Sequence, residues 1–448
     1  MQWERPDVTL YDSPTSGHKV GRSFMMPRTL EDLRVVSDAM RIWEEHTHGM
    51  MGRLPTYLNR GAMGLAAGAA YFSEADSRFG ANALRRYEYL REHDLCMTAT
   101  LSSPQANRAA SVANQADPFL AARIKEETNA GLIVRGCRML ATLPIADELL
   151  VYSGAPLRNP EQEAPYAFVF SIPSDTQGIR FICRESVDYG RSHYDHPLAS
   201  RFEELDAVVI FDDVLVPWEN IFVSHDVPRC NSAFSRTGAA VHMDHQTVVK
   251  NIVKAEFMLG LASLLVNSIG AEVFQHIYEK LAELWLNAET MKACLRAAEA
   301  DAALDEWQIM RPAEDPLVAA CILFSRMYPR MVEIIQQIGA SGLVAMPTEA
   351  DVRGPLAEDI KKFYQAARAE AFDRIPMFRL AWDASVSAFA SRQVLYERFS
   401  RGDPIRVANA LVLTHEDQLQ RCAERVYEFI RQGRDEAFAQ PSDDSVDG

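Results

Sequence analysis

The chain has 448 residues, of which 48% are hydrophobic and 24% are charged, a composition that can bury a large core. The formal net charge of −16 argues against binding to nucleic acid or to an anionic membrane surface, because the chain has no surplus of positive charge for the phosphates. The 7 cysteines contain no CxxC pair, so neither a zinc ribbon nor a disulfide framework is expected.

The N-terminal sequence, Met-Gln-Trp-Glu-Arg-Pro, has an acidic residue and a proline where a signal peptide has a basic stretch followed by an apolar one. The longest apolar segments, around 61–72 and 257–269, are shorter than the ~18 residues that a membrane-spanning helix needs. We therefore expect a cytoplasmic protein that does not enter a membrane.

Residues 1–94 are predicted to form a helical N-terminal domain. Thr29 and Asp32 resemble a capping box, and apolar residues at helical spacing follow up to residue 43. Helical patterns also cover about 57–72 and 80–93.

Between residues 95 and 225 the pattern changes to that of strands. Short apolar runs bounded by Pro, Gly, Asn and Asp lie at 131–136, 148–152, 166–172, 179–184 and 207–211. These runs predict a central β domain, either a compact sheet or a barrel.

Residues 226–436 are predicted to form a C-terminal antiparallel helical bundle. Long amphipathic, alanine-rich stretches lie at 248–267, 272–303, 319–338, 355–389 and 416–431. The last residues, 437–448, are polar and acidic and are predicted to be a disordered tail. The result is an α+β fold, mostly α, whose helical part, central β-barrel or sheet domain and helical bundle are compatible with acyl-CoA-dehydrogenase-like flavoproteins.

Several common catalytic motifs do not occur in the sequence. No GxGxxG follows a strand-like run, and there is no P-loop, GxSxG elbow or HExxH, which argues against a Rossmann nicotinamide site, an NTPase, an α/β-hydrolase and a zincin. The pairs His193/His196 and His242/His245 have i,i+3 spacing, but no third ligand is near in sequence, so we predict no metal site. His242 or His245 is a better candidate for a general acid or base, because histidine titrates near neutral pH.

The segment 49–57 presents Arg53 and Tyr57 at a Gly/Pro turn. Together these side chains could hold an oxyanion such as a phenolate by charge-assisted hydrogen bonds. The alternative is an arginine that caps a helix end beside a tyrosine of the core. The polar turn 103–108 suits the pyrophosphate or ribose of a dinucleotide, but such turns are equally common in plain loops.

These segments match a known family when they are taken together and in order. The matching segments are 49–57, 104–108, 131–136, 141–148, 183–185, 196–201, 211–219, 339–343, 395–398 and 402–404. They resemble the oxygenase component of the two-component 4-hydroxyphenylacetate 3-monooxygenase family, and the resemblance covers about residues 20 to 430.

The resemblance implies an acyl-CoA-dehydrogenase-like fold and a homotetramer. It implies that FAD binds between the strand domain and the bundle as FADH2, which a separate NAD(P)H-flavin reductase supplies. O2 is then the co-substrate, and a flavin C4a-hydroperoxide hydroxylates the ring of a phenol or a related electron-rich aromatic beside its oxygen. This chemistry needs a dry pocket and stabilisation of phenolate character.

The resemblance also implies roles for individual residues. Arg53 and Tyr57 match the positions that bind the phenol oxygen. The positions that match FAD-contacting residues are Gln105, Asn107, Arg108, Thr142, Asp403 and Arg406.

The chain departs from the family in its pocket. Ala99 stands where the family has a histidine that completes the cluster around the phenol oxygen, and Thr98, Thr100 or His242 are candidates to replace it. The Ser-Thr pair that holds the substrate carboxylate is replaced by Gly154 and Ala155, so we expect a substrate other than 4-hydroxyphenylacetate itself. The N-terminal domain is expected to be short relative to the family.

Two alternatives remain open at this stage. One is a degenerate, non-oxygenating paralogue that acts as a binding or scaffold protein. The other is a different flavin-dependent reaction on the same fold, such as that of 4-hydroxybutyryl-CoA dehydratase, whose iron–sulfur cluster needs cysteines that are not found around 49–53 and 242–250.

Overall fold

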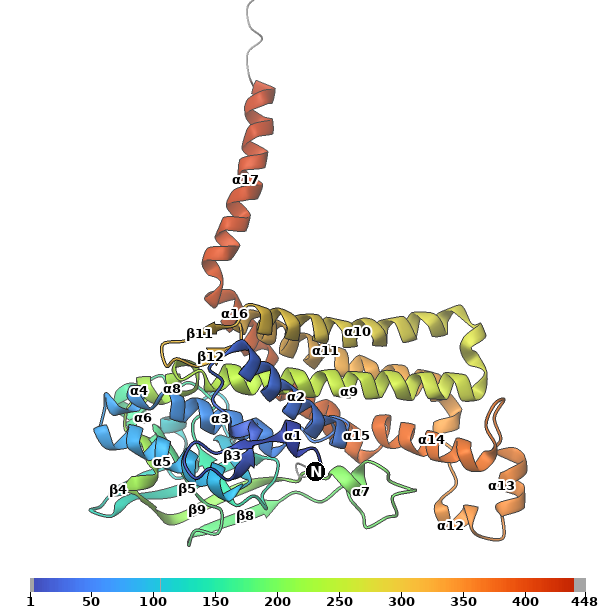
Figure 1. Cartoon of the computed structure of the whole chain (residues 1–448), viewed down its shortest axis with the longest axis horizontal. Helices are drawn as coiled ribbons and strands as arrows, with labels where there is room; N and C mark the ends of the chain where they lie inside the picture. The colour runs from blue at the N-terminus through green and yellow to red at the C-terminus, as the bar shows by residue number, and fades with distance from the viewer. Residues whose placement is uncertain (1–3, 105, 439–448) are drawn as a thin grey trace, which may run out of the picture. The chain divides into compact units, whose positions relative to one another are not determined.

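The structure is a computed structural model that describes residues 4–104 and 106–438 (Figure 1). It divides into two units, Met1–Arg398 and Phe399–Gly448. The first unit holds the sheet and most of the helices, and the second holds α16 (Pro404–Thr414) and α17 (Glu416–Phe438). Residues 437 and 438 of the predicted tail lie in α17, and the rest of that tail lies outside the described residues.

The first helices begin where the sequence places their caps. Thr29 accepts a hydrogen bond from the Asp32 N–H at 3.0 Å, and the Thr29 N–H donates to the Asp32 carboxylate at 2.9 Å, so the predicted capping box is confirmed. The stretch predicted as one helix over 57–72 is divided near Gly68. The helices here are α1 (Pro6–Thr9), α2 (Leu30–Thr47), α3 (Pro55–Ala67), α4 (Ala69–Ser73) and α5 (Ser77–His93).

The glycines of α3 let it approach the bundle closely. A Cβ on Gly64 would lie 2.4 Å from the Cα of Ala239, the first residue of α9 (Ala239–Ile269). Because only glycine permits this approach, α3 packs directly on α9 on one side and contacts the sheet on the other.

The predicted central β domain is a mixed sheet of eight strands in the order β10-β7-β6-β3-β5-β9-β8, with β4 paired to β5. Strands β3 and β6 run parallel, and the other described pairs of this sheet are antiparallel. The strands are β3 (Met97–Ser102), β4 (Arg123–Glu127), β5 (Gly131–Ala141), β6 (Glu148–Val151), β7 (Phe168–Pro173), β8 (Ile179–Cys183), β9 (Asp206–Pro217) and β10 (Ile221–Ser224). Short hairpins lie outside it: β1 (Leu10–Asp12) with β2 (Lys19–Gly21), and β11 (Ala303–Leu304) with β12 (Met310–Arg311).

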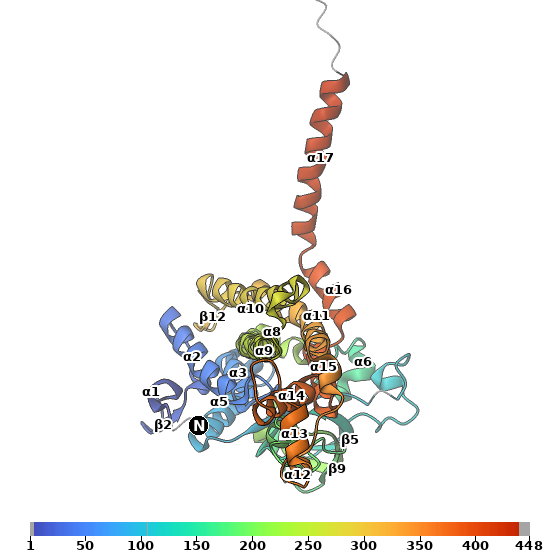
Figure 2. The same cartoon turned by 90° about the vertical axis from the view of Figure 1, so that its right-hand side faces the viewer.

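The bundle is built around α9, which Figure 2 shows nearly end-on between its neighbours. By length and composition alone α9 could cross a membrane, but 56% of its most apolar window is buried inside the protein, as in the core helix of a bundle. The helices that follow the sheet are α6 (Pro160–Glu163), α7 (Ala199–Phe202), α8 (Val227–Arg236), α10 (Gln275–Ala300), α11 (Glu314–Gly339), α12 (Glu349–Val352), α13 (Ala357–Phe363), α14 (Ala371–Ser385) and α15 (Ala388–Phe399).

The prediction of one helix over 355–389 is wrong. The chain forms α13, α14 and the start of α15 there, with a loop after α13 that is tied to the end of α9. In this loop the Arg368 N–H donates to the Ser268 carbonyl at 3.0 Å, and the Arg368 side chain donates to Asn267 Oδ1 at 2.8 Å. These tertiary contacts outweigh the helical preference of the sequence.

The mostly helical α+β class and the acyl-CoA-dehydrogenase-like order of helices, sheet and bundle are as expected. The boundaries of the three predicted domains, 1–94, 95–225 and 226–436, stay a prediction.

Candidate active site

Arg53 lies in the segment between α2 and α3, at the place where the sheet meets the bundle. It is only 8% exposed, and its guanidinium carbon lies 5.4 Å from the centroid of the Tyr57 ring. The Arg53 backbone N–H donates to Glu204 Oε1 at 3.1 Å, which fixes the main chain at this point. The structure therefore brings together the two residues predicted to bind a phenol oxygen.

Two further tyrosines complete the surroundings of Arg53. Burial lowers the pKa of Arg53, but the oxygens of Tyr57, Tyr396 and Tyr152 outweigh burial, and the pKa is raised above its ordinary value. Tyr396 is hydrogen-bonded to the guanidinium. Burial raises the pKa of Tyr152 and of Tyr396, which keeps both hydroxyls protonated at neutral pH.

The charge of Arg53 has no acidic partner in the part of the chain that the structure describes. Among the described residues no carboxylate lies within ion-pair distance of its side chain. A buried charge is expensive unless it is paired, so this guanidinium favours an anionic ligand. Tyr57, Tyr152 and Tyr396 are each only half-buried, so part of each side chain is exposed.

Helix α15 holds the segment that carries Arg53. Gln393 Nε2 donates to the Met50 carbonyl at 2.7 Å, and Arg392 Nη1 lies 2.6 Å from Glu204 Oε2. Glu204 thus joins α15 to the backbone of Arg53. These contacts preorganise the arginine before any ligand binds.

The predicted pocket residues on the sheet side differ in exposure. Ala99 is buried in β3, opposite Leu150 of β6. Gly154 is half-buried, and a Cβ there would lie 2.3 Å from Leu101 Cδ1. Ala155 is exposed. Neither Gly154 nor Ala155 offers a side-chain donor to a carboxylate.

The suggested replacements for the missing histidine are engaged elsewhere. The Thr98 hydroxyl donates to the Thr142 carbonyl at 2.7 Å, and the Thr100 hydroxyl donates to the Met139 carbonyl at 2.8 Å. His242 Nδ1 accepts from Arg60 Nη2 at 3.2 Å. Burial, followed by the Arg60 charge, lowers the pKa of His242 well below its ordinary value, so the imidazole is neutral.

His245 and His193, from the two histidine pairs, also have partners of their own. His245 Nε2 lies 2.9 Å from Glu299, and His193 Nδ1 lies 2.7 Å from the Ser200 hydroxyl. In the described part of the chain, no group of three or more His, Cys, Asp or Glu side chains could hold a metal ion.

The predicted FAD-binding residues are spread over both units. Thr142, at the end of β5, has a left-handed backbone with φ of 82°, a conformation that is often kept at functional sites. Asn107 and Arg108 are exposed in the loop after β3, and no described residue forms an ion pair with Arg108. Gln105 lies outside the described residues.

Asp403 and Arg406 belong to the second unit. The Asp403 carboxylate caps α16 by accepting from the backbone N–H groups of Ile405 and Arg406, at 2.9 and 3.0 Å. This cap accounts for the Asp403 side chain within its own unit. A role of Asp403 in FAD binding stays a prediction.

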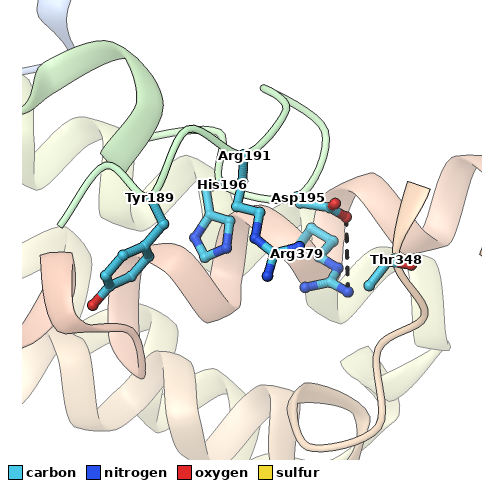
Figure 3. A pocket seen from close by; sticks show the side chains of 6 residues that line it. All are labelled: Tyr189, Arg191, Asp195, His196, Thr348 and Arg379. Carbon is cyan, nitrogen blue, oxygen red and sulfur yellow. Dashed lines mark ion pairs between the residues drawn. The ribbon is translucent and has the colours of Figure 1, made fainter. Parts of the chain in front are cut away.

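A cavity of about 380 Å³ lies elsewhere in the first unit, and Figure 3 shows the side chains around it. None of the predicted site residues lines it. Arg379 and Asp195 face one another there at 3.9 Å. The lining residues are Tyr189, Arg191, Asp195, His196, Thr348 and Arg379.

The Arg53 cluster also contains residues that the sequence did not predict: Tyr152, Tyr396 and Glu204. A signal for Tyr396 existed, because the segment 395–398 is one of those that carry the family resemblance. Tyr152 and Glu204 gave no such signal, because pairing of strands and helices far apart in sequence brings them to Arg53.

The comparisons with known proteins agree with the resemblance. The family described as 4-hydroxyphenylacetate 3-hydroxylase N terminal matches residues 1–223, and its C-terminal counterpart matches residues 230–431. The 4-hydroxyphenylacetate 3-monooxygenase oxygenase component of Geobacillus sp. (strain PA-9) is 45% identical over 432 residues, which cover 96% of this chain and 87% of that protein.

Solved structures give the same result. The oxygenase component of 4-hydroxyphenylacetate 3-monooxygenase complexed with FAD and 4-hydroxyphenylacetate has a TM-score of 0.91 at 42% identity, with 96% of this chain and 89% of that chain covered. A 4-hydroxybutyryl-CoA dehydratase from N. maritimus shares the fold, with a TM-score of 0.83 at 19% identity over 100% of this chain and 88% of that chain. The chain belongs to the 4-hydroxyphenylacetate 3-hydroxylase family.

Proposed function

We propose that this protein is the oxygenase component of a two-component, FADH2-dependent monooxygenase that hydroxylates a phenol with O2. The observation that carries the proposal is the buried guanidinium of Arg53, which has tyrosine neighbours and no acidic partner among the described residues. Family membership supplies the reaction type, and the Arg53 cluster supplies a place for the phenol oxygen.

We propose 4-hydroxyphenylacetate as the first candidate for the phenol substrate. The relative from Geobacillus carries that substrate in its name, and a structure 42% identical to this chain is a complex with it. These findings favour 4-hydroxyphenylacetate over the sequence prediction of a different phenol. A phenol without a carboxylate is the second candidate, because Gly154 and Ala155 have no side-chain donor for a carboxylate.

Arg53 and its neighbours supply the binding and polarisation that the reaction needs. The guanidinium and the Tyr57 hydroxyl bind the phenol oxygen, and the positive charge favours the phenolate form. A phenolate ring is richer in electrons beside its oxygen, so the carbon there is more reactive towards an electrophilic oxygen atom. Burial of Arg53 strengthens this effect because little water screens the charge.

The residues of the first unit fit a flavin cofactor. Arg108 is an exposed cation that pairs with no carboxylate among the described residues and suits a pyrophosphate, and Thr142 follows β5 as a buried residue with a strained backbone. Reduced FAD supplies the electrons that let O2 give one oxygen atom to the ring and the other to water. We propose FAD contacts for Gln105, Asn107, Asp403 and Arg406 as well.

Further parts of the system follow from this function. A separate NAD(P)H-flavin reductase supplies FADH2 by diffusion, and both proteins work in the cytoplasm. A homotetramer is supported by large apolar side chains that α10 and the turn before it leave more than half exposed: Phe274, Tyr278, Trp285 and Leu286.

The test is a single-turnover reaction. The protein is mixed with anaerobically reduced FAD and then with oxygenated buffer that contains 4-hydroxyphenylacetate or 4-methylphenol, and the catechol product and hydrogen peroxide are measured. We expect catechol to exceed peroxide with at least one of these phenols. Arg53→Ala should lower catechol formation ~10²–10³-fold and leave reduced-FAD affinity unchanged.

Arg108→Ala is the matched variant for the cofactor side. It removes an exposed arginine and should weaken reduced-FAD binding without changing the ratio of catechol to peroxide. If the wild-type protein turns all of its reduced FAD into peroxide with every phenol, the oxygenase proposal is wrong and the scaffold alternative gains support.

A further inference from the structure

Tyr396 of α15 packs against Gly52, the residue before Arg53. A Cβ added to Gly52 would lie 2.2 Å from Tyr396 Cζ and 2.6 Å from its hydroxyl oxygen. The hydroxyl is therefore packed against the residue directly before Arg53. The same hydroxyl is hydrogen-bonded to the Arg53 guanidinium.

The direction of this hydrogen bond follows from the chemistry of the two groups. A guanidinium carries only N–H donors, so Arg53 donates and the Tyr396 oxygen accepts. The hydroxyl proton of Tyr396 is then left to point away from the guanidinium. No described residue accepts a hydrogen bond from it, and part of the side chain is exposed although the hydroxyl itself is deeply buried.

The ring of Tyr396 is held by two cations, each of which is anchored by a carboxylate. The Arg392 guanidinium carbon lies 4.9 Å from the ring centroid, and Lys250 Nζ lies 5.4 Å from it. Arg392 is bound by Glu204 and Lys250 by Glu397, each at 2.6 Å. Because these anchors are themselves fixed, the ring and its hydroxyl oxygen keep one position.

We propose that Tyr396 is a catalytic residue that donates a hydrogen bond to the phenol oxygen bound by Arg53. This inference rests on the proposed function, since it concerns the same phenol. It gives the site a donor from α15 where β3 offers only the buried methyl group of Ala99. Arg53 thus binds both the Tyr396 oxygen and the phenol oxygen, and the Tyr396 O–H points from the first towards the second.

The test uses 4-nitrophenol, whose anion is coloured, as a probe of binding and ionisation. The probe is titrated from pH 5 to 9 into wild type, Tyr396→Phe and Arg53→Ala, each saturated with oxidised FAD, and difference spectra are recorded. Loss of a hydrogen bond to a charged oxygen should weaken binding of the anion about tenfold in Tyr396→Phe. The apparent pKa of the bound probe should rise by about one unit, because the donor stabilises the anion.

Tyr328→Phe is the matched control. Tyr328 is fully buried on α11, its ring centroid lies 4.5 Å from Lys254 Nζ, and its hydroxyl has no hydrogen-bond partner among the described residues. Removing this hydroxyl deletes the same atom from the same kind of packing. We expect the Tyr328→Phe variant to bind the probe with wild-type affinity and apparent pKa.

Tyr396→His keeps a donor and serves if Tyr396→Phe loses stability, which its Tm reports. Recovery of anion binding in Tyr396→His relative to Tyr396→Phe supports donation. The inference is overturned if folded Tyr396→Phe and Tyr396→His bind the anion equally weakly. It is also overturned if Tyr396→Phe binds the anion like wild type while Arg53→Ala does not bind it. Either result leaves the proposed function standing. Absence of both probe binding and catechol formation in wild type overturns the proposed function itself.

Discussion

Two clusters of buried cations meet α15 at neighbouring residues. Around Glu397 the charges of Lys250 and Lys254 are balanced by a carboxylate, whereas around Tyr396 the described neighbours of the Arg53 charge are phenols. The first cluster is closed, and the second is bordered by half-buried tyrosines. A paired charge in the core holds helices together, and an unpaired one leaves a place for a ligand.

The closed cluster is built with short contacts on every side. Glu397 lies 2.6 Å from Lys250 Nζ and 2.7 Å from Lys254 Nζ, and Lys254 also donates to Gln393 Oε1 at 2.6 Å. Burial raises the pKa of Glu397, but the two ammonium groups outweigh burial and hold it below its usual value. Burial lowers the pKa of Lys254 to about 8. The carboxylate is therefore the centre of this cluster.

The largest expected effect comes from removing that centre. Glu397→Gln removes the carboxylate that contacts both buried ammonium groups, and we expect the free energy of unfolding to fall by about 3–5 kcal/mol. Urea unfolding followed by circular dichroism measures the change. A variant as stable as wild type would contradict the view that this cluster is architectural.

The opposite effect on stability is expected for the cluster around Arg53 and Tyr396, which we call the open cluster. Arg53→Met replaces an unpaired buried charge by an apolar side chain, so the free energy of unfolding should stay within about 1 kcal/mol of wild type or rise. The same variant should lower kcat/KM for the phenol ~10²–10³-fold, which corresponds to about 2.7–4 kcal/mol. Arg53→Lys is the control, because it keeps the charge and loses the planar fork of donors. A stability loss in Arg53→Met as large as that of Glu397→Gln would remove the distinction between the clusters.

The third effect concerns Glu44, a second carboxylate of the closed cluster. Glu44 is fully buried and accepts from Gln246 Nε2 at 2.5 Å, and burial raises its pKa to about 8. Between its ordinary pKa of 4.5 and about 8 the unfolded chain is ionised there and the folded chain is protonated. The folded state then binds more protons, so stability falls as the pH rises through this window.

Glu44→Gln imitates the protonated side chain and removes this dependence. We expect its stability relative to wild type to increase by about 3–4 kcal/mol between pH 5 and 8, measured by urea unfolding at each pH. A constant difference across this range would mean that Glu44 is ionised in the folded protein.

Local features of the fold were predictable from the sequence because they depend on neighbouring residues. The capping box of Thr29 and Asp32 and the apolar runs of β5 to β9 are of this kind. The break between α13 and α14 was not, because contacts of Arg368 with the end of α9 decide it.

The candidate site follows the same rule. Arg53 and Tyr57 are four residues apart, across the turn that leads into α3, so their contact was predictable from local sequence. Tyr396 is more than 300 residues away in the sequence, and only the packing of α15 on Gly52 brings it to the arginine. The hydrogen bond between His242 and Arg60 was also not predictable from the sequence, since it joins α9 to α3.

The smallest expected effect comes from a change at Gly52, where the segment that carries Arg53 packs on α15. A Cβ there would lie 2.2 Å from Tyr396 Cζ and 2.6 Å from its hydroxyl oxygen, so Gly52→Ala must displace the tyrosine or the segment that carries Arg53. We expect a stability loss of about 1–3 kcal/mol and a larger proportional loss of hydroxylation than of reduced-FAD binding. Gly260→Ala is the control, because nothing lies within 4 Å of its added Cβ in α9, and it should be neutral or slightly stabilising. If Gly52→Ala lowered stability and left hydroxylation intact, the position of Tyr396 would matter for packing alone, and the open cluster would not depend on α15.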